Sequence, residues 1–209
     1  MRSWSIGGFP VQVLREESER ATLLVVGGRG TGGVLGLLLG SVAMSLAGHA
    51  ACPVVVVREP AESSRILPVV VGVDGSPYGE AAVAFAYEAA SLRGAPLVAV
   101  HTWSDLLFDS RVAPVLDWEA IETGEREVLA ERLAGWSEKF PDVPVRRVVY
   151  RDRPAHSLLE EAAHAQLLVV GSHGRGQLGG LVLGSVSHAV LHRAPCPVAV
   201  VRADTAVSS

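Results

Sequence analysis

The sequence predicts an α/β protein: a parallel sheet of five strands in the order 3-2-1-4-5, with helices on both faces, preceded by a partial copy of the same unit. Along residues 66–204, short apolar runs rich in valine alternate strictly with helical segments, and such alternation produces parallel sheets covered on both faces. Aromatic residues make up 5% of the chain, which suits a core of valine, leucine and alanine. Residues 23–58 recur as residues 167–202 with 20 of 36 positions identical, which indicates a duplicated domain.

The complete copy is expected to begin with a buried strand, because residues 67–73 form an apolar, β-branched run. Ser76 can cap the helix that follows, and Pro77 suits its first position. This helix is rich in alanine and is expected to reach Gly94, where glycine favours a helix end. A second apolar run predicts a strand at residues 97–101.

The rest of the complete copy continues the alternation. Residues 104–115 show no clear pattern and are expected to form a loop. The remaining predicted elements are helices at 118–140, 154–165 and 180–193, and strands at 145–150, 167–171 and 197–202. With right-handed crossovers, these elements predict a Rossmann-like sandwich whose ligands bind outside the carboxyl ends of the strands.

The repeat also predicts the domain boundaries. Its offset of 144 residues (171 − 27) aligns Met1 with Val145, so the first copy corresponds to the third through the fifth strand of the unit. We expect a partial repeat at residues 1–58, a linker at 59–65, a complete domain at 66–204 and a tail at 205–209. Without the first two strands, the fourth strand of the partial copy would have an exposed edge.

One segment is apolar enough to suggest a membrane span, because residues 30–57 contain no Asp, Glu, Lys or Arg. Its counterpart in the second copy, however, carries His188, His192 and Arg193. Seven glycines between positions 28 and 48 are also poor material for a lipid-embedded helix. We therefore expect a buried helix and no membrane partner. A net charge of −4 argues against nucleic-acid partners, and two distant cysteines fit a cytoplasmic protein.

The sequence Gly174-x-Gly176-x-x-Gly179 has the spacing of a dinucleotide-binding fingerprint. That fingerprint belongs on the first strand–helix turn of its fold and needs an acidic residue about 20 positions further on. Here the motif follows the fourth strand, and Val201-Arg202-Ala203 stands where the acidic residue belongs. These two departures disfavour a nicotinamide site.

A larger pattern fits a phosphate site better. Gly171-x-x-Gly174 is followed, after nine residues, by Gly184-Ser185. Glycines let backbone N–H groups approach a phosphate chain closely, and the serine hydroxyl adds a donor.

Charged side chains accompany this pattern. His173 and Arg175 could add positive charge beside a phosphate. Asp74 ends the first strand, where its carboxylate could accept hydrogen bonds from a ribose or from the adenine edge. In the order 3-2-1-4-5 the first and fourth strands are neighbours, so the Asp74 loop and the glycine loop should face each other across the switch point.

At Val71–Ser76, at the glycine pattern and at Cys196–Val201, the chain resembles the universal stress protein family. The resemblance covers residues 66–204 and, as the later part of another copy, residues 1–58. It implies a fold of the adenine-nucleotide alpha hydrolase type, with ATP, with or without Mg²⁺, as the cofactor. It also implies pairing of the last strands, Pro53–Val57 with Pro197–Val201, as an intrachain pseudo-dimer or in a homo-oligomer.

The resemblance further implies which residues contact the nucleotide. They are Gly72, Val73, Asp74, Thr102, Gly171, Ser172, His173, Gly174, Arg175, Gly176, Gly184, Ser185 and Val186. The partial copy keeps Gly27-x-x-Gly30 and Gly40-Ser41 but lacks the strand that carries the aspartate. We therefore expect no full ATP site there.

Three functions remain open: an ATP-binding stress-response module whose state follows nucleotide occupancy, a slow ATPase or nucleotidyl-transfer enzyme of a related fold, and a dimerisation module with an empty site. No catalytic residue is assigned, because no Ser–His–Asp order, nucleophile elbow or Walker motif is visible. The histidines show no metal-ligand spacing with carboxylates or cysteines. Taken singly, each glycine can simply serve a turn, Asp74 a helix cap, and His101, Cys52 and Cys196 the core.

Overall fold

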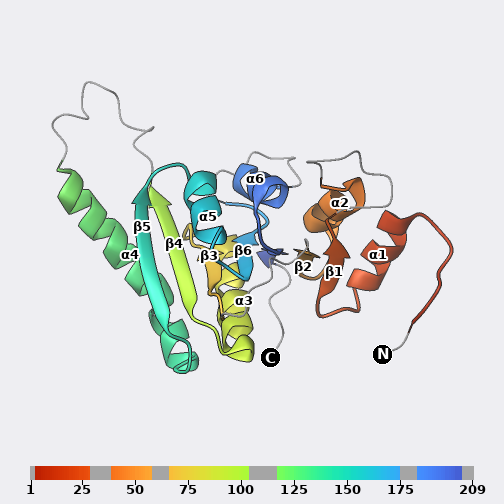
Figure 1. Ribbon diagram of the computed structural model, residues 1–209, viewed down its shortest axis with the longest axis horizontal. Coiled ribbons are helices and arrows are strands. Elements are labelled where there is room, and N and C mark those ends of the chain that lie inside the picture. The colour runs from red at the N-terminus through yellow and green to blue at the C-terminus, as the bar shows by residue number, and fades with distance from the viewer. Residues whose placement is uncertain (1–2, 29–38, 58–65, 104–116, 175–182, 204–209) are drawn as a thin grey trace, which may run out of the picture.

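The computed structural model describes residues 3–28, 39–57, 66–103, 117–174 and 183–203. Their strands form one seven-stranded sheet in the order β1-β2-β7-β6-β3-β4-β5 (Figure 1). Neighbouring strands are parallel except β2 and β7, which are antiparallel. The sheet is therefore larger than the expected five strands, because the two strands of the partial copy continue the sheet of the complete copy.

The elements alternate along the chain as the apolar runs predict. The strands are β1 (Leu24–Gly27), β2 (Val54–Val57), β3 (Val69–Gly72), β4 (Leu97–Trp103), β5 (Val145–Arg151), β6 (Leu167–Gly171) and β7 (Val198–Val201). The helices are α1 (Pro10–Ser18), α2 (Ser41–His49), α3 (Pro77–Arg93), α4 (Trp118–Lys139), α5 (Pro154–Ala162) and α6 (Ser185–Arg193).

Local chemistry explains several helix ends. The Ser76 hydroxyl oxygen accepts a hydrogen bond from the Gly79 N–H at 3.1 Å and so caps α3. That helix ends at Gly94, whose φ of 57° is a left-handed conformation that glycine adopts without a Cβ penalty. Helix α6 begins at Ser185, after Gly184, whose backbone is extended (ψ 154°). Residues 180–182 of the helix expected at 180–193 lie outside the described residues.

Alternate side chains of the strands fill two hydrophobic cores, one on each face of the sheet. Helices α3 and α4 cover the face to which Val69 and Val71 belong. Helices α2, α5 and α6 contribute to the core on the opposite face, where Val70 lies. This second core contains residues of both copies, so the partial copy shares a hydrophobic core with the complete one.

The partial copy repeats the geometry of the complete copy at the offset seen in the sequence. The bounds of α1 and α2 lie 144 residues before those of α5 and α6. Strand β2 pairs with β7 in antiparallel register, Val54 opposite Val200 and Val56 opposite Val198, which is the strand pair that the resemblance implied.

One expected element of the partial copy is not formed. Residues 3–7 align with the end of β5 but do not form a strand. In the complete copy β5 pairs with β4, and residues 3–57 contain no counterpart of β4 in the part that the structure describes. Without that neighbour, an extended segment has no partner for its backbone hydrogen bonds. Separately, no helix among the described residues is long and apolar enough to cross a membrane.

The shared core predicts that both copies unfold together. Leu46 of α2 is fully buried in the core that also contains Val198. Leu46→Ala should therefore lower the free energy of unfolding of the whole chain by about 2–5 kcal/mol. Denaturant unfolding followed by tryptophan fluorescence and far-ultraviolet circular dichroism measures it, with Val128→Ala on the partly exposed face of α4 as the control. A separate early transition in the mutant would contradict the shared core.

Candidate functional site

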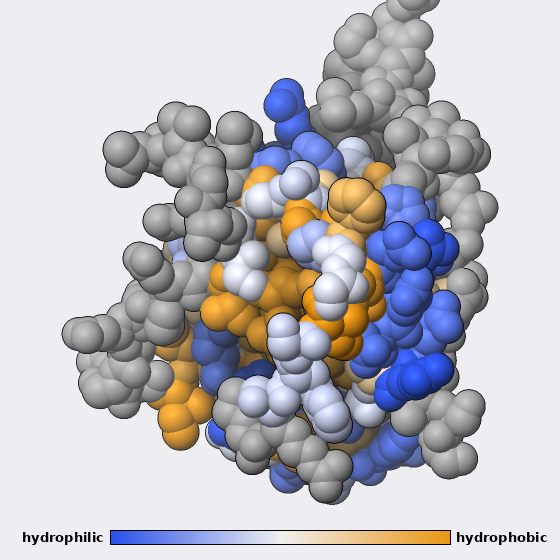
Figure 2. Space-filling view, turned by 90° about the vertical axis from the view of Figure 1, so that its right-hand side faces the viewer, coloured by the Kyte–Doolittle hydropathy of each residue, from blue (hydrophilic) through white to orange (hydrophobic). Residues whose placement is uncertain are grey.

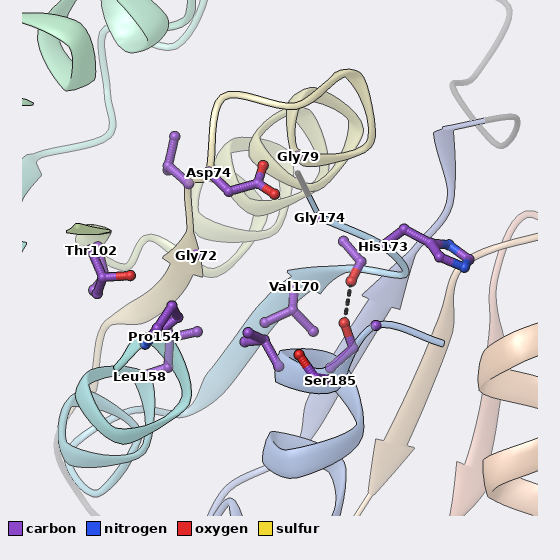
Figure 3. Close-up of a pocket in the computed structure, with 16 residues that line it drawn as sticks. Gly72, Asp74, Gly79, Thr102, Pro154, Leu158, Val170, His173, Gly174 and Ser185 are labelled. Atoms are coloured by element: carbon purple, nitrogen blue, oxygen red, sulfur yellow. Dashed lines mark hydrogen bonds between the residues drawn. The ribbon is translucent and has the colours of Figure 1, made fainter. Parts of the chain in front are cut away.

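A cavity of about 260 Å³ opens at the carboxyl ends of β3, β4 and β6 (Figure 3). Strands β3 and β6 are parallel neighbours, with Val71 opposite Val169. After β3 the chain continues to β4 on one side of the pair, and after β6 it continues to β7 on the other side. The loops that follow the two strands therefore diverge and leave a crevice between them. The cavity thus lies at the switch point of the sheet, where the sequence predicted that two loops would meet.

Asp74 closes one side of this cavity and is held by the turn that follows β3. Its Oδ1 accepts hydrogen bonds from the Ser76 N–H at 2.9 Å and from the Ser76 hydroxyl at 2.7 Å. The same hydroxyl oxygen caps α3 at Gly79. Asp74 is half-buried, and these bonds fix its carboxylate between β3 and the start of α3. A helix-cap role and a ligand role are compatible, because a carboxylate can accept about four hydrogen bonds.

Two glycines leave room for that carboxylate. A Cβ at Gly79 would lie 2.5 Å from Asp74 Oδ1, and a Cβ at Gly174 would lie 2.8 Å from Asp74 Oδ2. Both distances are too short for any larger residue in this arrangement. Figure 3 shows the Asp74 carboxylate between these two backbone segments. Asp74 and the glycine loop after β6 are therefore in direct contact.

The start of α6 forms the opposite side of the cavity. The Gly184 N–H donates to the Ser172 carbonyl at 2.8 Å, and the Ser187 hydroxyl donates to the Gly171 carbonyl at 2.6 Å. These bonds tie the helix to the end of β6. No side chain caps α6 at Gly184. The first N–H groups of a helix have no partner within the helix, and for those of Ser185 and Val186 none is found in the part of the chain that the structure describes. A helix start of this kind suits an anion.

The structure brings most of the predicted binding residues together. Those that line the cavity are Gly72, Val73, Asp74, Thr102, Gly171, His173, Gly174, Gly184, Ser185 and Val186. Ser172 is buried and does not line it. The His173 imidazole points away from Asp74 and Ser185 in Figure 3; the Ser172 hydroxyl lies 3.1 Å from its Nδ1. Arg175 and Gly176 lie outside the described residues.

Sequence reasoning missed the apolar floor of the cavity. Val100, Pro154, Leu158 and Val170 line it, and a Cβ at Gly72 would lie 3.2 Å from a Leu158 methyl group. The position of Pro154 could have indicated this floor from the sequence. Pro154 begins a helix directly after the third strand of the unit, and the carboxyl end of that strand lies at the same sheet edge as Asp74. Gly79 and Ser187 also line the cavity and had no motif to mark them.

His101 connects the end of β3, next to Asp74, with helix α4. It is buried, its Nδ1 lies 2.7 Å from the Val73 carbonyl oxygen, and its Nε2 lies 2.7 Å from Glu125 Oε2. The histidine therefore links α4 to the backbone next to Asp74, which agrees with its interpretation as a hydrogen-bonded core residue. Cys52 and Cys196 are both buried, and neither belongs to a disulfide. Burial raises the pKa of the Cys52 thiol. Among the described residues, no cluster of three histidine, cysteine or carboxylate side chains has metal-site geometry.

The contact between Gly79 and Asp74 predicts opposite effects of two glycine substitutions in helices. Gly135→Ala in α4 meets open space and should raise the free energy of unfolding by about 0.5–1 kcal/mol, because alanine restricts the unfolded chain and favours helix. Gly79→Ala should instead lower it, since the new methyl group meets Oδ1. Denaturant titration checks both signs. Combining Gly79→Ala with Asp74→Ala should remove most of the loss; an unchanged loss would mean that the carboxylate is not the obstacle.

Comparisons with known proteins agree with this architecture. A universal stress protein of Mycobacterium tuberculosis is 50% identical over 205 residues, which cover 97% of this chain and 69% of that protein. One from Mycolicibacterium smegmatis is 50% identical over 194 residues, covering 91% of this chain and 65% of that protein.

Solved structures show the same fold at lower identity. A universal stress protein from Archaeoglobus fulgidus has a TM-score of 0.65 at 23% identity and covers 92% of this chain and 65% of that one. One from Lactobacillus plantarum has a TM-score of 0.59 at 23% identity and covers 67% of this chain and all of that one. A model of the universal stress protein family matches residues 4–58 and 66–202. The chain therefore belongs to the universal stress protein family.

Proposed function

We propose that this protein is an ATP-binding stress-response module with one nucleotide site, in the cavity between Asp74 and the start of α6. The observation that carries the proposal is the combination, across one cavity, of a fixed carboxylate and a helix N-terminus without a side-chain cap. The carboxylate suits the hydroxyl and amino donors of a nucleoside, and the helix start suits its phosphates. A nucleoside phosphate offers both kinds of group in one molecule.

The phosphate end of the ligand would lie against α6. Gly184 and Gly174 keep this side free of large side chains, so a phosphate can approach the N–H groups of Ser185 and Val186. A helix N-terminus carries about half a positive charge, and the Ser185 hydroxyl adds a donor. Because Asp74 is negative, a phosphate is favoured at the helix and disfavoured beside the carboxylate.

The nucleoside end would lie over β3 and β4. Asp74 and Thr102 supply polar groups there, while Val100 and Leu158 supply apolar surface. The cavity volume of about 260 Å³ is slightly below the range of roughly 300–1,000 Å³ typical of ligand sites. A nucleoside would fill it, and the outer phosphates would extend beyond it.

Charge balance favours binding of the Mg²⁺ complex. Neither lysine nor arginine is among the described residues that line the cavity, so the described lining neutralises little of the charge of a triphosphate. Mg²⁺ bound to the phosphates themselves would reduce that charge without a protein ligand, because this ion commonly keeps several waters and binds through substrate phosphates. ATP should therefore bind more tightly in the presence of Mg²⁺.

Nucleotide occupancy would act as the signal. A ligand shifts a protein between conformations only by its difference in affinity for them. Bound ATP would bridge the loop after β3 and the start of α6, two segments that belong to different elements. We propose that occupancy stabilises one arrangement of these segments and thereby changes affinity for a partner protein.

Equilibrium dialysis with radiolabelled ATP and Mg²⁺ tests the proposal, and the repeat supplies a matched control. Wild type should bind close to one ATP per chain. Asp74→Ala should weaken binding by roughly 10- to 100-fold, because a hydrogen bond to a charged group contributes about 1.5–3 kcal/mol. Gly184→Val should abolish it, because the two methyl groups of valine extend beyond a Cβ that would itself be in van der Waals contact with the His173 Cα at 3.4 Å. Gly40→Val, at the equivalent position of the partial copy, should leave binding unchanged.

Three outcomes would count against this function. Wild type that binds no ATP at millimolar concentration would favour a dimerisation module. Two ATP per chain would mean that the partial copy also holds a site. Release of phosphate that depends on Asp74, measured in the same samples, would favour a slow ATPase.

A further inference from the structure

The last residues of β4 connect the cavity with helix α4. Thr102 lines the cavity (Figure 3). His101 and Trp103, its neighbours in the sequence, lie on the opposite face of the sheet, because successive side chains of a strand point to opposite faces. On that face His101 contacts Glu125 and Trp103 contacts Trp118, both residues of α4. A change in the position of this strand end at the cavity is therefore passed to both contacts.

The first contact is part of a hydrogen-bonded chain. The His101 Nδ1 donates to the Val73 carbonyl oxygen at 2.7 Å, because a carbonyl oxygen can only accept, and Nε2 lies 2.7 Å from Glu125 Oε2. Val73 lines the cavity and directly precedes Asp74. The imidazole is 2% exposed, and it cannot turn without breaking one of these bonds. The chain thus sets the distance between α4 and the turn that holds Asp74.

The second contact is a stack of rings at the start of α4. Trp103, the last residue of β4, stacks on Trp118, the first residue of α4, with ring centroids 5.8 Å apart. The Arg151 guanidinium, from the end of β5, lies 3.6 Å from the centroid of the Trp118 ring and 5.7 Å from that of the Trp103 ring. A cation over an aromatic face is attracted by the ring. The stack therefore holds the first turn of α4 at the same sheet edge as the cavity.

One polar atom of this stack is not satisfied. The Trp103 indole Nε1 is buried and has no hydrogen-bond partner in the part of the chain that the structure describes. A buried donor without an acceptor costs free energy. An alternative arrangement in which this N–H finds an acceptor would avoid that cost. The unpaired donor thereby narrows the free-energy difference between the two arrangements, and a small difference is one that a ligand can shift.

We propose that helix α4 responds to nucleotide occupancy of the cavity, and that His101 and Trp103 are the positioning residues that connect its first turns to the site. The inference rests on the proposed nucleotide site and names the element through which occupancy reaches a partner protein. A nucleotide that contacts Asp74 and Thr102 restrains the ends of β3 and β4, and the two side chains behind them carry that restraint to α4. Because coupling between two sites is reciprocal, a change on α4 also alters the site.

The connection is measured first without nucleotide. Glu125→Ala removes the acceptor on α4 and changes no residue that lines the cavity. Amide hydrogen exchange at Ser76 and Gly79, whose N–H groups hold the Asp74 turn, should become about threefold faster or more, because a weaker connection raises the population of locally opened states. Glu125→Gln keeps an acceptor and should restore the wild-type rates. Glu127→Ala, which changes an exposed side chain of the same helix, is the matched control and should leave them unchanged.

The response to nucleotide is then measured on α4 itself. Saturating ATP with Mg²⁺ should slow amide exchange of residues 118–127 by about fivefold or more in the wild type, since a bound ligand lowers the population of opened states. The double variant Trp118→Ala with Glu125→Ala should still bind ATP in equilibrium dialysis, but exchange in its α4 should no longer respond. The unfolding midpoint of each variant shows that it is folded.

The partial copy supplies a control region in the same sample. Helix α1 lies at the opposite end of the molecule from α4 (Figure 1). Figure 2 faces that end and shows hydrophobic residues gathered at its centre with hydrophilic residues beside them. Neither contact of α4 extends to α1, so exchange of the α1 amides should be the same with and without ATP. Equal slowing in both helices would show a general gain in stability and would overturn the inference.

The inference and the proposed function fail in distinguishable ways. ATP that binds without slowing exchange in α4 would overturn the inference and leave the function intact. A wild type that binds no ATP would overturn the function, and with it the response of α4 to a nucleotide. Equal exchange rates at Ser76 in Glu125→Ala and Glu127→Ala would overturn the connection whether or not ATP binds. A response of α4 that persists in the double variant would overturn the roles of His101 and Trp103.

Discussion

The parallel pairing of β3 with β6 is the contact on which the candidate site depends. It joins residues about one hundred positions apart in the sequence, with Val69 opposite Leu167. Because the strand order reverses at this pair, one chain turn leaves toward α3 and the other toward α6. Asp74 and Gly174, at the ends of these two strands, are thereby brought into contact. No local property of either loop could produce this cavity without the strand pair beneath it.

Small residues then determine how closely the loops approach. A Cβ atom added at Gly79 or at Gly174 would lie less than 3 Å from an oxygen of the Asp74 carboxylate. At Gly184 the backbone N–H reaches the Ser172 carbonyl and fixes the start of α6. The same bond recurs in the partial copy, from the Gly40 N–H to the Gly28 carbonyl. The glycine pattern therefore serves the helix–strand junction in both copies, and only the complete copy adds the aspartate strand that turns this junction into a cavity.

The repeat is an internal comparison of one sequence in two environments. Val25 and Val169 occupy equivalent strands and differ only in their neighbours, yet one is more than half exposed and the other is fully buried. Burial of a side chain is thus set by the elements packed on it and not by its own hydrophobicity. The antiparallel pairing of β2 with β7 attaches the partial copy to the complete sheet, and the core beneath α2 and α6 stabilises that attachment.

Local sequence patterns were sufficient to predict the α/β class and most helix and strand positions, because apolar alternation and capping residues act within a few positions of the chain. The repeat was visible because identical residues recur at a fixed offset. Local patterns also marked Asp74, Gly174 and Gly184, since an aspartate after a buried strand and regularly spaced glycines are visible without a structure. The apolar floor at Val100 and Leu158, the buried place of Ser172 and the outward His173 ring were settled only by tertiary packing. So was the absence of a strand at residues 3–7, because a strand forms where a neighbour accepts its hydrogen bonds. Contacts between distant segments decide such features, and a sequence pattern does not contain them.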